Sequence, residues 1–156
     1  MDDDALRPLG LVLLPQPLET FPLRGEVEDL RRAGRLVAVD PPHVSYDRLA
    51  RLPAVIAEIL ADGQARRLVK TLRKRGDVPR LVVIFEPAQY LIARGVLRRG
   101  DDAELWYRPL DPSGERRART TELHEQASAR TALTLSPGPP GPEVAERLRE
   151  LELAGG

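Results

Sequence analysis

The chain has 156 residues, 42% of them hydrophobic and 31% charged, and its 24 basic and 24 acidic residues cancel. This length and composition predict one globular domain with a sizeable core, and the zero net charge argues against a dedicated DNA-binding domain. With no cysteine and only two histidines, the chain cannot form disulfides, Cys-based zinc sites, iron–sulfur clusters or a His-rich metal site.

The start of the chain and its hydropathy indicate a cytoplasmic protein. Residues Met1 to Asp4 are acidic and lack the basic cluster and apolar stretch of a signal peptide. No apolar run approaches the roughly 20 residues that a membrane-spanning helix needs. We expect an acidic tail over residues 1–8, one domain over 9–153 and a frayed end over 154–156.

Short apolar runs alternate with amphipathic stretches along the chain. The apolar runs predict five strands, at residues 9–14, 35–40, 81–86, 104–108 and 131–136. The amphipathic stretches predict helices at 26–33, 45–61, 65–75, 88–99, 116–130 and 143–153, with Pro53 interrupting or restarting the second. Strands that alternate with helices form right-handed βαβ units. The predicted fold class is therefore α/β: a single Rossmann-like domain with a mainly parallel sheet of about five strands and helices on both faces.

Two local features refine the predicted strands. The Gly-Asp-Val-Pro segment at 76–79 is typical of a turn, so the third strand should begin after it. Trp106 and Tyr107 are adjacent in the fourth strand, and their side chains should therefore point to opposite faces of the sheet. One Trp and one Tyr in a central strand more often belong to the core than to a stacking platform.

The signatures of the common nucleotide-binding and hydrolytic enzymes are absent. A dinucleotide fold carries G-x-G-x-x-G after its first strand, whereas this loop reads PQPLETFPLRG with Gly25 alone. The P-loop pattern and the G-x-S-x-G nucleophile elbow do not occur either. The first strand lacks the clustered acids of a phosphorelay receiver, and the third ends in Glu86 rather than Asp. We expect no cofactor and no metal.

The remaining clue is position, because open parallel sheets bind ligands beyond the carboxyl ends of their strands. The polar residues expected there are Gln16, Asp40, Glu86, Asp111 and Ser136. Each has a structural alternative, since strand-end acids often cap the following helix.

Arg24 and Gly25 stand just before the first predicted helix, where a helix N-terminus can receive an anion. Glu26, Glu28 and Asp29 fill the same turn, and their charge would satisfy the helix dipole and repel phosphate. An anion site and a purely structural helix start both remain open at this point.

The junction after the third strand gathers a carboxylate, an amide and a phenol at Glu86, Gln89 and Tyr90. These groups could hold a polyhydroxy ligand, or they could cap a helix while the Tyr90 ring packs on a neighbour. Asp111 is a weak candidate for a general base, and the alternative is a turn-forming Asp before Pro112.

The densest charge run lies on the helix predicted at 65–75. Its cations are Arg66, Arg67, Lys70, Arg73, Lys74 and Arg75, and its apolar side carries Leu68, Val69 and Leu72. Such a basic face can contact anionic lipid or phosphate, with Arg66, Arg67, Lys70 and Arg73 making the contact. The alternative is a face that is simply solvated.

Four motifs carry a family resemblance. They are RLVAVDPP at 35–42, LVVIFEP at 81–87 followed by Tyr90 and Ala93, AELWY at 103–107 leading to Asp111, and ELHEQA at 122–127 followed by ALTLS at 132–136. Their order over roughly residues 9–150 resembles the N-terminal, acceptor-side domain of GT-B-type glycosyltransferases, in particular the bacterial ones related to family four.

The resemblance implies a domain that presents a sugar acceptor at its strand ends and faces a second Rossmann-like domain, which binds the nucleotide-sugar donor through a Glu-rich motif. It implies an acceptor cleft at Glu86, Tyr90 and Asp111. Glu143 and Glu150 do not reproduce the donor motif, so the domain should be inactive without a donor-binding partner. Two alternatives stay open: a non-enzymatic Rossmann-like module that binds a protein or small ligand, and a peripheral membrane protein.

Overall fold

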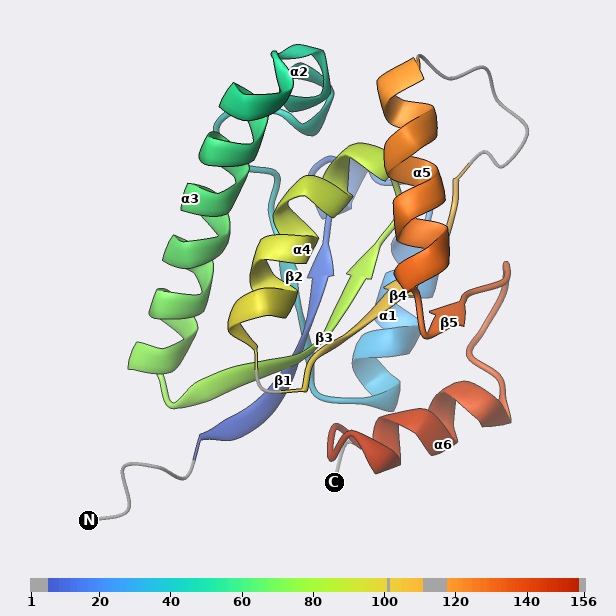
Figure 1. Cartoon of the computed structure of the whole chain (residues 1–156). Coiled ribbons are helices and arrows are strands. Elements are labelled where there is room, and N and C mark those ends of the chain that lie inside the picture. Colours follow the sequence, from blue (N-terminus) through green and yellow to red (C-terminus); the bar gives the residue numbers. More distant parts are fainter. Residues whose placement is uncertain (1–5, 101, 111–117, 155–156) are drawn as a thin grey trace.

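The computed structural model describes residues 6–100, 102–110 and 118–154. Within them, five strands form one sheet in which every neighbouring pair is parallel, in the order β2-β1-β3-β4-β5 (Figure 1). The strands are β1 (Arg7–Leu13), β2 (Leu36–Val39), β3 (Asp77–Ile84), β4 (Glu104–Tyr107) and β5 (Leu133–Thr134). The predicted α/β class, the parallel sheet and its five strands are confirmed.

Helices cover both faces of this sheet (Figure 1). They are α1 (Arg24–Ala33), α2 (Tyr46–Arg51), α3 (Ala54–Lys74), α4 (Tyr90–Arg99), α5 (Ala118–Arg130) and α6 (Pro142–Glu150), with short 3-10 turns η1 (Leu18–Thr20) and η2 (Pro87–Gln89). Helices α1 and α6 pack on one face, and α2, α3, α4 and α5 pack on the other. The domain is therefore a three-layer, doubly wound sandwich.

An apolar core lies between the sheet and each of its two helix layers. The alternation of side chains along the strands supplies both cores. Leu11 and Leu13 point to the α2–α5 side, whereas Val12 and Leu14 point to the α1–α6 side. Tyr107 lies in the first core and Trp106 in the second, and both are buried. The prediction that these two aromatic side chains occupy opposite faces is confirmed.

The strand order places the topological switch point between β1 and β3. The chain leaves β1 for β2 on one side and then returns past β1 to β3 on the other. This is the order of flavodoxin-like doubly wound sheets, in which ligands bind where the carboxyl ends of the two switch strands diverge. The carboxyl edge of the sheet is thus the first place to look for a site.

Strand β3 is longer than predicted, because it begins at Asp77 and includes the segment that was expected to form a turn. Pro79 has no N–H to give to a ladder, and sheets accept proline at irregularities. The β1–β3 register shifts between Leu9 and Gly10, which pair with Pro79 and Leu81. Tertiary pairing with β1 therefore overrides the local turn signal.

Helix α3 also differs from prediction, because the chain from Ala54 to Lys74 is one helix rather than the end of one and the start of another. Pro53 does restart the helix, as one of the two readings had it. The predicted gap at residues 62–64 is helical, and this part of α3 packs on α4. Gly95 of α4 allows this close approach, since a Cβ there would lie 2.7 Å from the Cβ of Ala65.

Strand β5 is shorter than predicted, and at its start the Thr131 side chain bonds to β4. The hydroxyl of Thr131 accepts a hydrogen bond from Tyr107 N at 3.0 Å and donates to Leu105 O at 3.1 Å. The regular ladder to β4 is left with Leu133 and Thr134. In the part of the chain that the structure describes, no helix combines the length and apolarity needed to cross a bilayer.

Candidate functional site

The carboxyl edge of the sheet divides into two halves that differ in construction. The inner half lies beyond the ends of β1 and β3, at the topological switch point. The outer half lies beyond the ends of β4 and β5, between α1 and the start of α6.

At the inner half, one buried side chain, Gln89, joins the two strand ends. The β1–β3 register ends at Val12 and Val83, and beyond it the Gln89 amide bridges the two strands. Its Oε1 accepts hydrogen bonds from Phe85 N at 2.7 Å and from Glu86 N at 3.0 Å, while its Nε2 donates to Leu13 O at 2.7 Å. These backbone groups are therefore occupied by the protein itself and do not face a ligand.

Tyr46 and Glu86 surround this bridge. Burial raises the pKa of the Tyr46 phenol well above its ordinary value; a hydrogen bond with Gln89 opposes the rise, and the charge of Glu86 adds to it. Glu86 is half-buried, and burial raises its pKa, with a further contribution from the charge of Asp47. Burial therefore makes the charged form of each group less favourable than it is in water.

The other residues predicted from the sequence are divided between two helices, Tyr90 on α4 and the neighbours Arg24 and Gly25 on α1. Tyr90 begins α4 and is buried in the groove between α3 and α4, with the Arg94 guanidinium 6.0 Å from its ring centroid. Arg24 is exposed, and its Nε donates to Glu28 Oε1 at 3.0 Å. Gly25 opens onto free space. Asp111, the candidate general base, lies outside the described residues.

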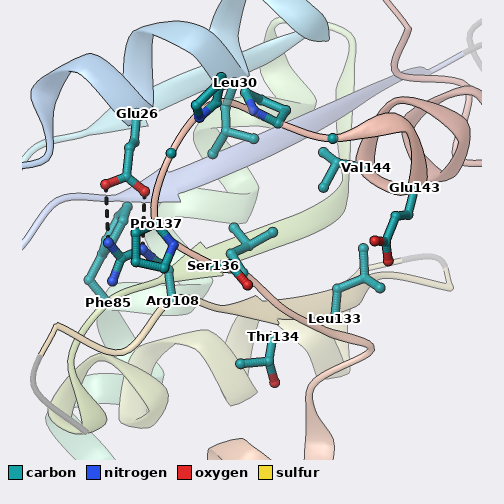
Figure 2. Close-up of a pocket in the computed structure, with 15 residues that line it drawn as sticks. Glu26, Leu30, Phe85, Arg108, Leu133, Thr134, Ser136, Pro137, Glu143 and Val144 are labelled. Atoms are coloured by element: carbon teal, nitrogen blue, oxygen red, sulfur yellow. Dashed lines mark hydrogen bonds and ion pairs between the residues drawn. The ribbon is translucent and has the colours of Figure 1, made fainter.

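The outer half of the edge holds an open pocket of about 280 Å³ (Figure 2). Its walls come from α1, the ends of β3, β4 and β5, the loop 136–141 and the first turn of α6. Pockets for drug-sized ligands start near 300 Å³, so this one suits a smaller molecule or one end of a larger one.

An ion pair between Glu26 of α1 and Arg108 after β4 lines this pocket (Figure 2). Arg108 Nε donates to Glu26 Oε1 and Arg108 Nη2 donates to Glu26 Oε2, each at 3.1 Å, in the planar two-point geometry favoured by guanidinium and carboxylate. Arg108 Nη1 also donates to Pro109 O at 2.7 Å. The side chains are 10% and 22% exposed for Arg108 and Glu26. The pocket therefore offers both donors and acceptors while carrying no net charge from this pair.

The remaining walls are mostly apolar, with the Thr134 hydroxyl and the Glu143 carboxylate among them, and the rim is stiff. Leu30, Phe85, Leu133 and Val144 supply the apolar surface (Figure 2). The rim is the segment Ser136-Pro-Gly-Pro-Pro-Gly141, in which proline restricts the backbone. Its glycine at 138 has a φ of +106°, a conformation that favours glycine. Paired polar groups beside an apolar wall suit a ligand with hydroxyl groups on one side and C–H groups on the other.

The sequence indicated part of this site. Ser136 was expected at the carboxyl edge, and it does line the pocket. Glu26 was interpreted only as a charge near a helix N-terminus, and Arg108 only as a strand end. They are 82 residues apart, and nothing in the local sequence signals that they meet.

Comparison with known proteins adds no homologue to this description: no family model, curated protein or solved structure matches the chain significantly. Among the residues that the structure describes, there is also no cluster of three or more His, Cys, Asp or Glu side chains that could hold a metal ion. The geometry of the pocket thus carries the functional argument.

Proposed function

We propose that this chain is an acceptor-binding domain of a glycosyltransferase, and that the pocket beyond β4 and β5 holds the acceptor. The observation that carries the proposal is the Glu26–Arg108 pair in the wall of a small, partly apolar pocket at the carboxyl edge of a parallel sheet. The resemblance of the strand-end motifs to GT-B acceptor domains points to the same edge.

The charged groups of the pocket favour a neutral, hydroxyl-rich ligand over an anion, because Arg108 is already paired with Glu26 and Glu143 adds a carboxylate. A sugar hydroxyl both donates and accepts, so it can bind to a carboxylate and to a guanidinium that are already paired. A nucleotide sugar carries a diphosphate. The Arg108 cation that could bind it is already engaged by Glu26, and the Glu143 carboxylate in the same wall would repel it. A donor nucleotide therefore fits this pocket poorly, in keeping with the absence of a glycine-rich loop after β1.

The domain contributes positioning rather than bond chemistry. Holding an acceptor hydroxyl at a fixed place beside a donor converts an encounter into a near-unimolecular step. A donor-binding partner supplies the activated sugar in this scheme. This chain keeps the acceptor in orientation through Glu26, Arg108 and the apolar wall.

A second candidate is a non-enzymatic interaction module. One observation favours it: Gln89 joins the strand ends at the switch point, where doubly wound folds bind their ligands. In that case the pocket beyond β4 and β5 is an ordinary surface hollow, and the domain serves to bind another macromolecule.

A thermal-shift screen tests the proposal with neutral oligosaccharides and lipid-free glycosides in one panel and nucleotide sugars in another. A ligand at about 100 times its dissociation constant stabilises the native state by roughly 2.7 kcal/mol, which is readily measured. We expect stabilisation by members of the neutral panel. Stabilisation by nucleotide sugars alone would overturn the acceptor assignment, and no response to either panel would favour the interaction module.

A variant that fills the pocket tests whether the ligand that causes the thermal shift binds there. Ser136→Trp places a large ring at the exposed rim and should abolish the shift, whereas Ser128→Trp, on the exposed side of α5, should retain it. Equal loss in both variants would argue against binding in this pocket. Both sites are exposed, so neither substitution should unfold the protein.

A further inference from the structure

Helix α3 exposes an aliphatic patch that no other part of the described chain covers. Val55, Ile56, Ile59 and Leu60 are 67%, 48%, 66% and 42% exposed. Single exposed aliphatic residues are ordinary on protein surfaces, but a contiguous group on one helix marks a contact surface. In Figure 1, α3 runs along the outer side of the molecule, over α4.

The second half of the same helix is basic. Its exposed cations are Arg66, Arg67, Lys70, Arg73 and Lys74, and Arg75 follows at the helix end. From Gly63 to Lys74 the helix contains no acid. None of these cations forms an ion pair with any acid that the structure describes.

The acids of the first half do not weaken this surface. Glu58 pairs with Arg94 at 3.1 Å, and Asp62 pairs with Arg98 and Arg99 at 3.0 and 2.6 Å. The guanidinium of Arg99, through its hydrogen bond, holds the pKa of Asp62 below its ordinary value despite partial desolvation. Both carboxylates lie on the flank toward α4 and are neutralised there.

The aliphatic patch and the basic half share one face. Helix α3 packs inward through Ala57, Ala61, Ala65, Val69 and Leu72. With 3.6 residues per turn, positions 55, 56, 59 and 60 and the cations at 66, 67, 70, 73 and 74 all lie on the opposite, outward half. The 21 residues of the helix span about 32 Å at 1.5 Å per residue. The result is one long face, aliphatic at its start and basic over the rest.

We propose that this outward face of α3 docks the protein on an anionic lipid bilayer. The four aliphatic side chains enter the boundary between headgroups and acyl chains, and the cations contact headgroup phosphates. A wide hollow lined by Arg66, Lys70, Arg73, Lys74 and Arg99, with Val69 among them, adjoins this face and can take a headgroup. This docking is independent of the acceptor pocket, which lies at the carboxyl edge.

Charge and side-chain type distinguish lipid from other partners. Nucleic acid would use the cations but has no place for four exposed branched aliphatic chains. Protein interfaces concentrate aromatic side chains at their centre, and this face has none among its exposed residues. Anionic lipid uses both halves of the face at once.

Vesicle co-sedimentation of the full chain tests the proposal. We expect binding to vesicles of 70% phosphatidylcholine and 30% phosphatidylglycerol, weakening with added salt, and little binding to pure phosphatidylcholine. Each cation near an anionic surface contributes about fivefold in affinity, so Arg66→Gln with Lys70→Gln should lower the partition coefficient about 25-fold. The double variant Ile56→Ser with Ile59→Ser should lower it by about tenfold or more.

A matched variant removes two exposed cations from the other face of the sheet. Arg31→Gln with Arg149→Gln should change the partition coefficient by less than about twofold. Equal loss in this control, equal binding to both kinds of vesicle, or no binding to either would overturn the proposal. Concentration-dependent self-association that the Ile56 and Ile59 substitutions abolish, without vesicle binding, would instead assign the face to a second copy of the chain.

Insertion has its own readout, because the chain contains no cysteine. A polarity-sensitive fluorophore on Ile59→Cys should shift to shorter wavelength with anionic vesicles. The same label on Glu146→Cys of α6 should not shift. An unshifted label at position 59 in a vesicle-bound protein would contradict aliphatic insertion.

Discussion

The two halves of the carboxyl edge of this sheet differ in whether a protein side chain occupies them. At the inner half, Gln89 joins β1 to β3 and leaves the backbone groups there satisfied. At the outer half, Glu26 and Arg108 face a pocket that no side chain fills. The same fold rule applies to both, since both lie beyond strand ends. The difference shows that the rule of ligand binding beyond strand ends locates only the edge of the sheet. Particular side chains decide which part of that edge is free to bind a ligand.

The largest expected effect on stability comes from removing the Gln89 hydrogen bonds at the inner half. Gln89→Leu keeps the bulk but leaves the buried groups Phe85 N, Glu86 N and Leu13 O without their partners. We expect a loss of about 3 kcal/mol in the free energy of unfolding, measured by urea denaturation. Gln16→Leu is the control, because among the described residues the Gln16 side chain bonds only to nearby Thr20. This substitution should cost under about 0.5 kcal/mol. Similar losses of unfolding free energy in the two variants would refute the role of Gln89 in joining β1 to the end of β3.

The outer half should respond less strongly in stability. Glu26→Gln leaves the Arg108 charge unpaired in a side chain that is 10% exposed. Breaking fully buried pairs costs about 3–5 kcal/mol, and the partial exposure of Glu26 reduces our expectation to about 1–2 kcal/mol.

The same helix offers a matched control for that variant. Glu28→Gln breaks the exposed pair with Arg24 and should cost under about 0.5 kcal/mol. A double-mutant cycle that adds Arg108→Met isolates the pair. A coupling energy near zero would show that Glu26 and Arg108 do not interact in solution.

The smallest effect is a pH dependence at the inner half. Burial raises the pKa of Glu86, so the native state holds its proton to higher pH than the unfolded chain does. Stability is therefore lost as pH rises from the ordinary value of 4.5 through the raised pKa. Glu86→Gln should be slightly more stable than wild type at pH 7, and this gain should vanish below about pH 4.

Thermal melts at the two pH values measure this difference. Exposed Glu19→Gln serves as the control, and we expect its melting temperature to follow wild type at both. A gain for Glu86→Gln that is the same at pH 4 and pH 7 would show that the carboxylate charge is not its cause.

Much of the fold was predictable, because buried strands and amphipathic helices leave a clear pattern of apolar residues in the sequence. The apolar runs that became β1, β3 and β4 lie between layers and are apolar on both faces. The errors arose where distant contacts override local preference. Pro79 reads as a turn residue, and only pairing with β1 shows that it belongs to a strand. Residues 62–64 were left between two predicted helices, whereas in the structure they continue one helix that packs on α4.

The site was less predictable than the fold, for a physical reason. Ser136 follows a strand, so the edge rule finds it. Glu26 and Arg108 each have an ordinary local explanation, and their meaning comes from a pairing across 82 residues. Gln89 looked like a possible ligand group, whereas the structure uses its amide between two strands. Single residues are ambiguous until their partners are known.

The measurement that tests the central claim most directly is an amide NMR titration of the full chain with the neutral glycoside that stabilises it best. We predict that the amide signals of Ser136, Gly138, Gly141 and Val144, which line the pocket, move together with one dissociation constant. Signals of Gln16 and Ala88 at the inner half should stay in place. Movement confined to the inner half, with the pocket amides unchanged, would contradict the assignment of the acceptor to the pocket beyond β4 and β5.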